Sequence, residues 1–129
     1  MERLDHIAFL LPDTQILALW ERLLARKPTH EEVLESQGLK VYSFQIGAVR
    51  IDLMEPLPEA GIEQPSAPSP ETNLHHIAFY TEQIEEETQR LKEVGYVPLM
   101  ESPVQVGMGQ EGILLRRPDG LLIELVRFG

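Results

Sequence analysis

Two histidines and two carboxylates are the side chains of this chain that point most directly to chemistry. His6 and His76 each stand near the start of one half of the sequence, and Asp52 and Glu124 each stand near the end of one half. Imidazole nitrogen and carboxylate oxygen are suitable ligands for divalent Mn, Fe, Co, Ni or Zn. The chain has no cysteine, so a metal would have to be held by nitrogen and oxygen alone.

The four residues occupy equivalent positions of an internal repeat. Residues 4–9 (LDHIAF) return as residues 74–79 (LHHIAF) with five of six positions identical, and residues 51–54 (IDLM) return as residues 123–126 (IELV). Two matches in the same order indicate a duplicated unit. Pseudo-twofold packing of the two copies would bring both histidines and both carboxylates toward one axis. The repeat therefore predicts a metal site of two nitrogen and two oxygen ligands.

Each of these residues, considered singly, could instead have a purely structural role. A lone histidine in an apolar strand is more often a hydrogen-bonded core or surface residue than a ligand, and we expect this of His30 and His75. Strand alternation turns Asp52 away from its apolar neighbours. Glu124 lies within a run of apolar residues, where a buried carboxylate needs a partner.

The elements that must position these side chains follow the same order in both halves. Apolar periodicity and turn residues predict a β-α-β-β-β series in each half. In the first half the expected strands and helix are strand 3–10, helix 14–26, and strands 30–36, 39–46 and 49–55. In the second half they are strand 74–80, helix 83–94, and strands 96–101, 111–116 and 121–127. The fold class is therefore α+β.

The domain organisation follows from length and composition. A chain of 129 residues suits one domain, here spanning 1–129, with module 1 at about 3–55 and module 2 at about 74–128. Residues 56–73 contain five prolines and form the expected linker. A linker of this length allows the modules to pair within one chain or to exchange between chains.

Charge and hydropathy exclude several classes of function. Hydrophobic residues make up 43% of the chain and charged residues 25%, which is ordinary globular composition. The formal net charge of -10 repels phosphate backbones, so nucleic-acid binding is not expected. The sequence shows neither a secretion signal nor an apolar run long enough to span a membrane, so we expect a cytoplasmic protein that does not bind membranes.

The repeated LDHIAF and LHHIAF motifs, together with RRPDGLLIELV at 116–126, resemble the vicinal oxygen chelate superfamily, also called the glyoxalase/bleomycin-resistance/dioxygenase group. The resemblance implies two βαβββ modules that form an open, barrel-like mixed sheet around one divalent ion, for which Co, Mn, Ni and Zn are candidates. It implies the ligand set His6, Asp52, His76 and Glu124. At position 52 the metal enzymes of this pattern mostly have Glu or Gln.

Within the superfamily the chain most resembles the methylmalonyl-CoA epimerase family. The similar segments are 35–41 (ESQGLKV), 51–57 (IDLMEPL) and 101–109 (ESPVQVGMG). The resemblance implies an isomerase that epimerises methylmalonyl-CoA or a similar acyl-CoA through a metal-stabilised enolate, with Glu124 both a ligand and the catalytic proton-transfer group. A homodimer is expected.

Two departures from the epimerase pattern keep alternatives open. Val41 occupies a position where some epimerases have a glutamate base, so Glu35 and Gln37 are the nearby candidates for the second acid or base. Residues 117–120 (RPDG) are closer to lactoylglutathione lyases. The alternatives are a glyoxalase I-type lyase acting on a glutathione adduct, and a non-catalytic member of the superfamily that binds a small molecule.

Overall fold

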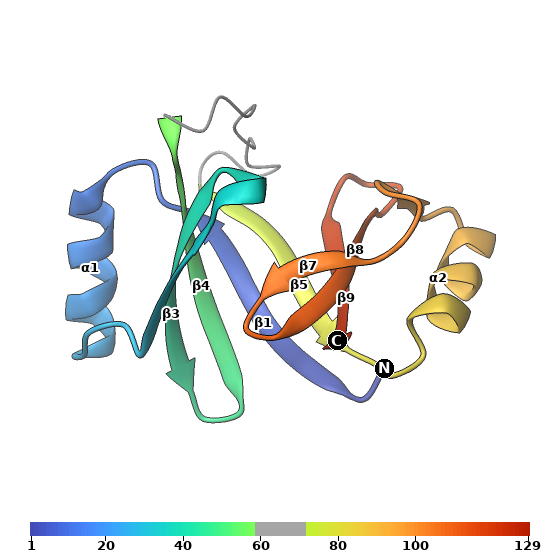
Figure 1. Ribbon diagram of the computed structural model, residues 1–129, viewed down its shortest axis with the longest axis horizontal. Helices are drawn as coiled ribbons and strands as arrows, with labels where there is room; N and C mark the ends of the chain where they lie inside the picture. Colours follow the sequence, from blue (N-terminus) through green and yellow to red (C-terminus); the bar gives the residue numbers. More distant parts are fainter. Residues whose placement is uncertain (59–71) are drawn as a thin grey trace. The chain divides into compact units, whose positions relative to one another are not determined.

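The computed structural model describes residues 1–58 and 72–129 of the chain (Figure 1). The elements of the first half are β1 (Arg3–Leu10), α1 (Thr14–Leu24), β2 (His30–Leu34), the 3-10 turn η1 (Glu35–Gln37), β3 (Leu39–Ile46) and β4 (Val49–Pro56). The elements of the second half are β5 (Leu74–Tyr80), α2 (Ile84–Glu93), β6 (Val97–Pro98), β7 (Val104–Gly107), β8 (Gln110–Arg116) and β9 (Leu122–Phe128). The predicted α+β class is confirmed.

The second half departs from its expected strands in one place. A single strand was expected over 96–101, whereas the structure has the two-residue β6 and, after a break, the separate β7, both paired with β8. Pro98 and Pro103 flank the break. Proline has no N–H to give to a sheet ladder, so a strand that contains it is short or irregular. Of the expected linker 56–73, residues 59–71 lie outside the described part of the chain.

The described residues form two compact units whose limits fall inside β1 and β5. The N-terminal unit comprises Ile7–His75, and the C-terminal unit comprises Met1–His6 together with His76–Gly129. The first residues of β1 thus belong with the second half of the sequence. His6, at the end of that stretch, is consequently part of the C-terminal unit.

In the N-terminal unit the strand order is β2-β3-β4-β1, and α1 packs on one face of β3 and β4 (Figure 1). Alternation along the strands turns Phe44 and Leu53 toward the helix, where both are fully buried against Trp20 and its neighbours. Asp13 caps the helix by accepting hydrogen bonds from the backbone N–H groups of residues 15 and 16. The helix ends at Ala25, which has a left-handed backbone conformation.

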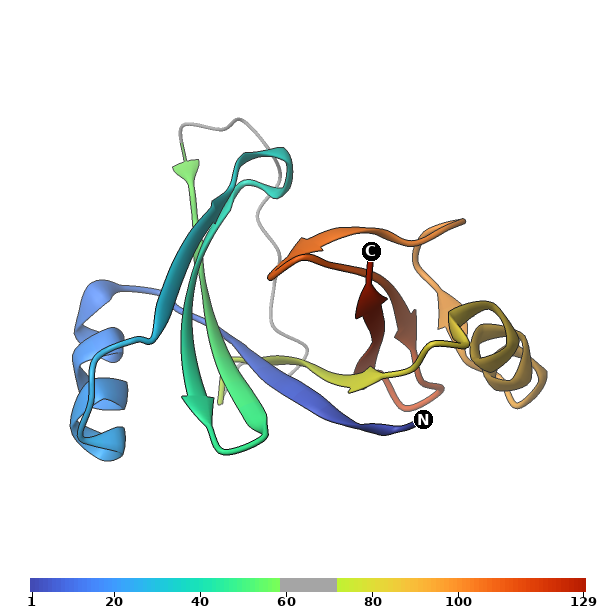
Figure 2. The ribbon, with the colours of Figure 1, turned by 60° about the horizontal axis from the view of Figure 1, so that its bottom comes forward.

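In the C-terminal unit the strand order is β5-β9-β8-β6, with β7 also paired to β8. β5 runs parallel to β9 and the other pairs are antiparallel, so the sheet is mixed. α2 lies against this sheet (Figure 2). Its Ile84 and Leu91 are buried with Ile113, Leu115 and Leu125 of the sheet. The residues of β5 and β9 that alternate with these core residues point to the other face of the sheet. The positions of the candidate site are among them.

Among residues 1–58 and 72–129, no helix has both the length and the apolar character needed to cross a lipid bilayer.

Candidate metal site

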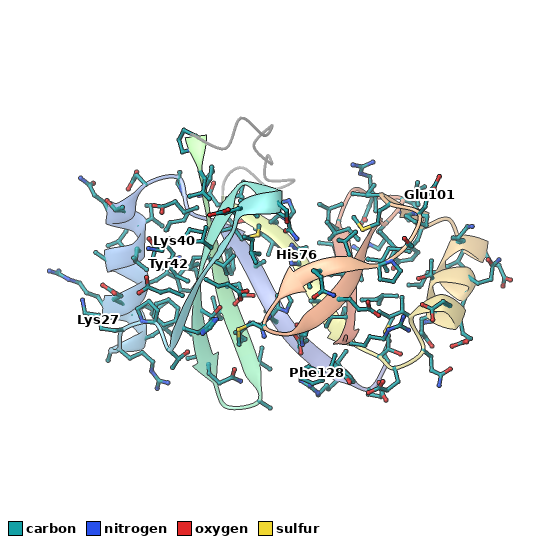
Figure 3. The ribbon with its side chains drawn as sticks, viewed as in Figure 1. Lys27, Lys40, Tyr42, His76, Glu101 and Phe128 are labelled. Atoms are coloured by element: carbon teal, nitrogen blue, oxygen red, sulfur yellow. The ribbon has the colours of Figure 1, made fainter. Side chains whose placement is uncertain are left out.

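Three of the four predicted ligands come together in the C-terminal unit. His6 ends the part of β1 that belongs to this unit, and Glu124 lies in the middle of β9. His76 lies on β5 (Figure 3). The parallel register of β5 and β9 pairs Ala78 with Glu124. The exposed fractions of His6, His76 and Glu124 are 3%, 6% and 5%, so all three polar side chains are buried. Burial of three such groups in one place requires that they satisfy one another or a bound ion.

The donor atoms of the three side chains converge. His6 Nε2 lies 3.2 Å from His76 Nε2 and 3.2 Å from a carboxylate oxygen of Glu124. His76 Nε2 lies 3.5 Å from the same oxygen, Oε1. These three atoms, one from each residue, therefore form a nearly equilateral triangle. They lie close enough together to bind one metal ion.

The size of this triangle fits one divalent transition-metal ion. Two ligand atoms that each lie about 2.1 Å from an ion are about 3.0 Å apart at a right angle and about 3.4 Å apart at the tetrahedral angle. The two observed separations of 3.2 Å fall within this range, and the third, 3.5 Å, falls just beyond it. Two imidazoles and one carboxylate are also the donor set that Zn, Mn, Co and Ni accept. The residues present thus fit the expected ion in type and in spacing.

The electrostatics keep the carboxylate in its ligand form. Burial by itself raises the pKa of Glu124, but the charge and hydrogen bonds of His76 and His6 outweigh burial and lower the pKa below its usual value. Glu124 is therefore ionised at neutral pH. An ionised carboxylate can bind a cation without first losing a proton.

Small residues make room for the Glu124 side chain. Gly112 on β8 lies beside it, and a Cβ at this position would come within 3.0 Å of the Leu125 carbonyl oxygen, 3.0 Å of a Val126 methyl and 3.4 Å of Glu124 Cγ. Ala78, the register partner of Glu124, is fully buried. A side chain at position 112 would therefore crowd the Leu125 carbonyl and Val126 and would also contact the Glu124 Cγ atom.

A carboxylate that the sequence reasoning missed holds the first histidine. Asp5 Oδ2 lies 2.7 Å from His6 Nδ1, the ring nitrogen that does not face the triangle. Asp5 Oδ1 accepts hydrogen bonds of 3.2 Å from Arg3 Nη1 and 3.2 Å from Gln110 Nε2. Adjacent residues of a strand are expected to face opposite sides, so alternation alone does not predict the contact between Asp5 and His6. The one signal available was an acidic residue next to a candidate ligand.

The fourth predicted ligand, Asp52, lies on β4 in the N-terminal unit. Its Oδ1 accepts hydrogen bonds from Ser43 Oγ at 2.7 Å and from Arg50 Nε at 2.8 Å, and Ser43 is its register partner on β3. All three residues are buried on the face of β3 and β4 that α1 does not cover. Arg50 is thus buried against a carboxylate. That Asp52 is a metal ligand stays a prediction.

The other two histidines differ in their surroundings. His30 opens β2, is exposed, and has its Nε2 3.5 Å from Glu32. His75 is buried in β5. In the N-terminal unit Glu35 and Gln37 form η1, which Gly38 ends in a left-handed conformation. Their role as acid or base stays a prediction.

Lys40 and Tyr42 form a second polar group of the N-terminal unit (Figure 3). The Lys40 ammonium lies 4.8 Å from the centre of the Tyr42 ring and 3.3 Å from Glu31. The Tyr42 hydroxyl donates a hydrogen bond to Glu55. The one cation, Lys40, is thus paired with Glu31 and the Tyr42 hydroxyl is bonded to Glu55, so these contacts stabilise the sheet and do not by themselves indicate a ligand site.

Comparison with known sequences identifies related proteins over nearly the whole chain. The sequence profile of the Glyoxalase/Bleomycin resistance protein/Dioxygenase superfamily matches residues 5–113. The uncharacterized protein YqjC of Bacillus subtilis is 31% identical over 130 residues, which cover 97% of this chain and 91% of that protein. An ethylmalonyl-CoA/methylmalonyl-CoA epimerase of Cereibacter sphaeroides is 28% identical over 131 residues, which cover 95% of this chain and 96% of the enzyme.

Comparison with solved structures confirms the predicted fold. A hypothetical protein from Bacillus halodurans has a TM-score of 0.78 and 30% identity, with 96% of this chain and 92% of the other covered. Methylmalonyl-CoA epimerase of Streptomyces coelicolor, solved as a variant with 2-nitronate-propionyl-CoA, has a TM-score of 0.76 and 25% identity, with 98% and 96% covered. A methylmalonyl-CoA epimerase in complex with methylmalonyl-CoA and ammonium also has a TM-score of 0.76 and 25% identity, with 98% and 94% covered.

Proposed function

Because the chain belongs to the glyoxalase/bleomycin resistance protein/dioxygenase superfamily, we propose that it is a metal-dependent epimerase of methylmalonyl-CoA or of a similar acyl-CoA. The observation that carries the proposal is the buried triangle of His6, His76 and Glu124 donor atoms. The substrate class rests on the epimerases of similar sequence and structure, two of which were solved with acyl-CoA ligands.

His6, His76 and Glu124 are the residues that would hold the ion, and Asp52 is proposed as the fourth ligand. A divalent cation supplies Lewis-acid stabilisation of the negative charge that develops on a thioester oxygen when the neighbouring C–H is deprotonated. The protein's own contribution is a fixed set of donors. The two imidazoles would present nitrogen to the ion, and Glu124 would offset part of its positive charge inside the unit, where these side chains are buried.

The proposed proton-transfer role of Glu124 can be separated from its role as a ligand. A base works best when its pKa lies near the operating pH, and the pKa of Glu124 is shifted downward, away from that range. A Glu124→Asp variant keeps a carboxylate but shortens its reach by one methylene. Retained metal with loss of proton exchange favours proton transfer by this group, whereas loss of both supports ion binding alone.

The experiment that tests the proposal follows the C2 proton of methylmalonyl-CoA. Protein loaded with Co²⁺, Mn²⁺, Ni²⁺ or Zn²⁺ is incubated with the substrate in D₂O, and deuterium at C2 is measured by mass spectrometry. We expect wash-in with the metal-loaded protein and none after chelation. Metal content by elemental analysis should fall from one equivalent in the wild type to none in His76→Ala. The matched control is His30→Ala, which removes an exposed histidine of the N-terminal unit.

A specific feature of the second half favours the lyase as a second candidate. Residues 117–120 (RPDG) form a turn in which Arg117 Nε donates to Asp119 at 2.7 Å and Gly120 has a φ of 99°. This is the segment that is similar to lactoylglutathione lyases. Consumption of the methylglyoxal–glutathione adduct without deuterium exchange would favour the lyase. Inactivity in both assays would leave a small-molecule-binding member of the superfamily.

We also propose a homodimer, as expected from the resemblance. Light scattering coupled to size-exclusion chromatography gives the mass directly, against 14.7 kDa for one chain.

A further inference from the structure

We infer that Asp5 and Gln110 are positioning residues that hold the His6 ring with its proton on Nδ1 and its Nε2 lone pair directed at His76 and Glu124. This inference rests on the proposed function, because it assigns the residues that make Nε2 available to a metal. Asp5 and Gln110 are 105 positions apart in the sequence, but both belong to the C-terminal unit of the structure.

The first step is the tautomer of His6. Asp5 Oδ2 lies 2.7 Å from Nδ1, and a carboxylate oxygen only accepts hydrogen bonds, so Nδ1 must be the donor. When the ring is neutral it carries one proton, here on Nδ1, and Nε2 then has a lone pair; only the protonated, charged ring can also donate from Nε2 to Glu124. Nε2 therefore meets the triangle as a ligand atom. A histidine that binds metal is commonly oriented in this way by a carboxylate on its second nitrogen.

The second step is the orientation of Asp5 itself. Arg3 Nη1 and Gln110 Nε2 both donate to Oδ1, which leaves Oδ2 turned toward the histidine. The exposed fractions of Asp5 and Gln110 are 4% and 2%, so the bond between them is shielded from water, whereas the Arg3 side chain is 44% exposed. Two donors on one oxygen thus determine which oxygen His6 meets.

The third step is an otherwise unexplained feature of Gln110. Its Oε1 is buried and has no hydrogen-bond partner, which is unfavourable for a polar atom. Turning the amide around would set Oε1 against Asp5 Oδ1, oxygen against oxygen. The bond to Asp5 therefore determines the orientation of the amide, although the amide oxygen is left without a hydrogen bond. A residue that served only to fill the core would be better replaced by an apolar side chain at this place.

The repeat shows that this arrangement is particular to one histidine. The position equivalent to Asp5 in the second copy is His75, so the duplicated motif carries its acidic residue beside His6 only. The two imidazoles of the triangle thus differ in the residue that precedes them, although they occupy equivalent positions of the repeat.

An isosteric change of Asp5 makes a sharp test. In Asp5→Asn the side-chain oxygen should face Arg3 and Gln110, because both donate, and the amide nitrogen should then face His6. Nδ1 must accept from that nitrogen, so the ring proton moves to Nε2 and blocks the lone pair. Gln110→Leu should have a weaker effect in the same direction, because Arg3 still donates to Oδ1.

The readout is the protonation of the ring nitrogens, measured on metal-free protein labelled with ¹⁵N-histidine by long-range ¹H–¹⁵N correlation. The pH is kept well above the usual histidine pKa of about 6.5. The His6 signals are identified by their loss in His6→Gln. We expect the proton on Nδ1 in the wild type, on Nε2 in Asp5→Asn, and a mixture in Gln110→Leu. Asp119→Asn is the matched control, since it changes an arginine-paired but exposed carboxylate, and it should behave as the wild type.

Co²⁺ titration by calorimetry on the same samples completes the test. Asp5→Asn should weaken Co²⁺ binding about 10- to 100-fold. The inference would be overturned if folded Asp5→Asn kept the His6 proton on Nδ1, or if the wild type did not carry that proton on Nδ1. Unchanged Co²⁺ affinity in Asp5→Asn would overturn it as well. If the wild type binds no Co²⁺, the proposed metal dependence fails, and the ring protonation still decides whether Asp5 and Gln110 position His6.

Discussion

Gly112→Ala tests whether the close approach of β8 to Glu124 is a requirement of the site. The added Cβ would lie 3.0 Å from the Leu125 carbonyl oxygen and 3.0 Å from a Val126 methyl, both on the neighbouring strand β9. The carbonyl oxygen belongs to the backbone of a paired strand and cannot turn aside. Relief therefore requires that β8 and β9 move apart or that Val126 and Glu124 shift.

The magnitude follows from two opposing effects. Overpacking of a tight interior costs about 1–3 kcal/mol, whereas replacing glycine by alanine stabilises by about 0.4–1 kcal/mol through the unfolded state. The net expectation is a loss of about 1–2 kcal/mol in the free energy of unfolding, or roughly 3–6 °C in Tm for a chain of this size. Because Glu124 Cγ is also within 3.4 Å of the new methyl, Co²⁺ affinity should fall together with stability.

The assay is urea denaturation followed by circular dichroism, with Co²⁺ titration of the folded protein. The matched control is Gly109→Ala, just before β8, where the backbone φ is +69° and nothing lies within 4 Å of the new methyl. That change should lower stability by about 1 kcal/mol through backbone strain alone and leave Co²⁺ affinity unchanged. A Gly112→Ala protein as stable as the wild type, with equal Co²⁺ affinity, would refute the reasoning.

Three further predictions concern features outside the triangle. Asp13→Ala removes the side-chain cap of α1 and should cost about 0.5–2 kcal/mol in urea denaturation, and Asp13→Asn, which keeps an acceptor, should cost much less. Leu53→Ala creates a cavity in the core under α1 and should cost about 2–5 kcal/mol; a smaller loss would show that the helix collapses onto the space. The Arg117 guanidinium lowers the pKa of Asp119 to about 2, so Arg117→Ala should return it toward 3.8 in an NMR titration. This depressed pKa makes the pair stabilising above pH 3.8 and progressively less so as the pH falls toward 2, and an unchanged titration of Asp119 would contradict the assignment.

Much of the local structure was determined by the sequence alone. The bounds of β1, β3 and β5 match the strands expected from apolar alternation, and both helices lie within a residue or two of their expected ranges. The reason is that alternation and helical periodicity are properties of neighbouring residues, which the chain order itself supplies. The internal repeat likewise predicted that the two histidines and Glu124 come together, and their donor atoms do converge, because duplicated strands place equivalent residues at equivalent positions.

What the tertiary structure decided was which side chains meet. By the repeat, Asp52 and Glu124 are equivalent, yet Glu124 lies against two imidazoles while Asp52 accepts bonds from Ser43 and Arg50. The strands that carry the two carboxylates have equivalent neighbours, because β4 lies between β3 and β1 as β9 lies between β8 and β5. The difference comes from the residues that the register places beside each carboxylate: Ser43 lies opposite Asp52 on β3, whereas Leu114 lies opposite Glu124 on β8.

The contact of Gln110 with Asp5 is a second example of a pairing that the sequence alone does not predict. These residues are 105 positions apart, and their meeting depends on the first residues of β1 lying in the unit built from the second half of the chain. Local pattern sets the face that a side chain takes. Its partner on that face depends on the order and register of strands that are distant in sequence, and these arise only when the whole unit folds.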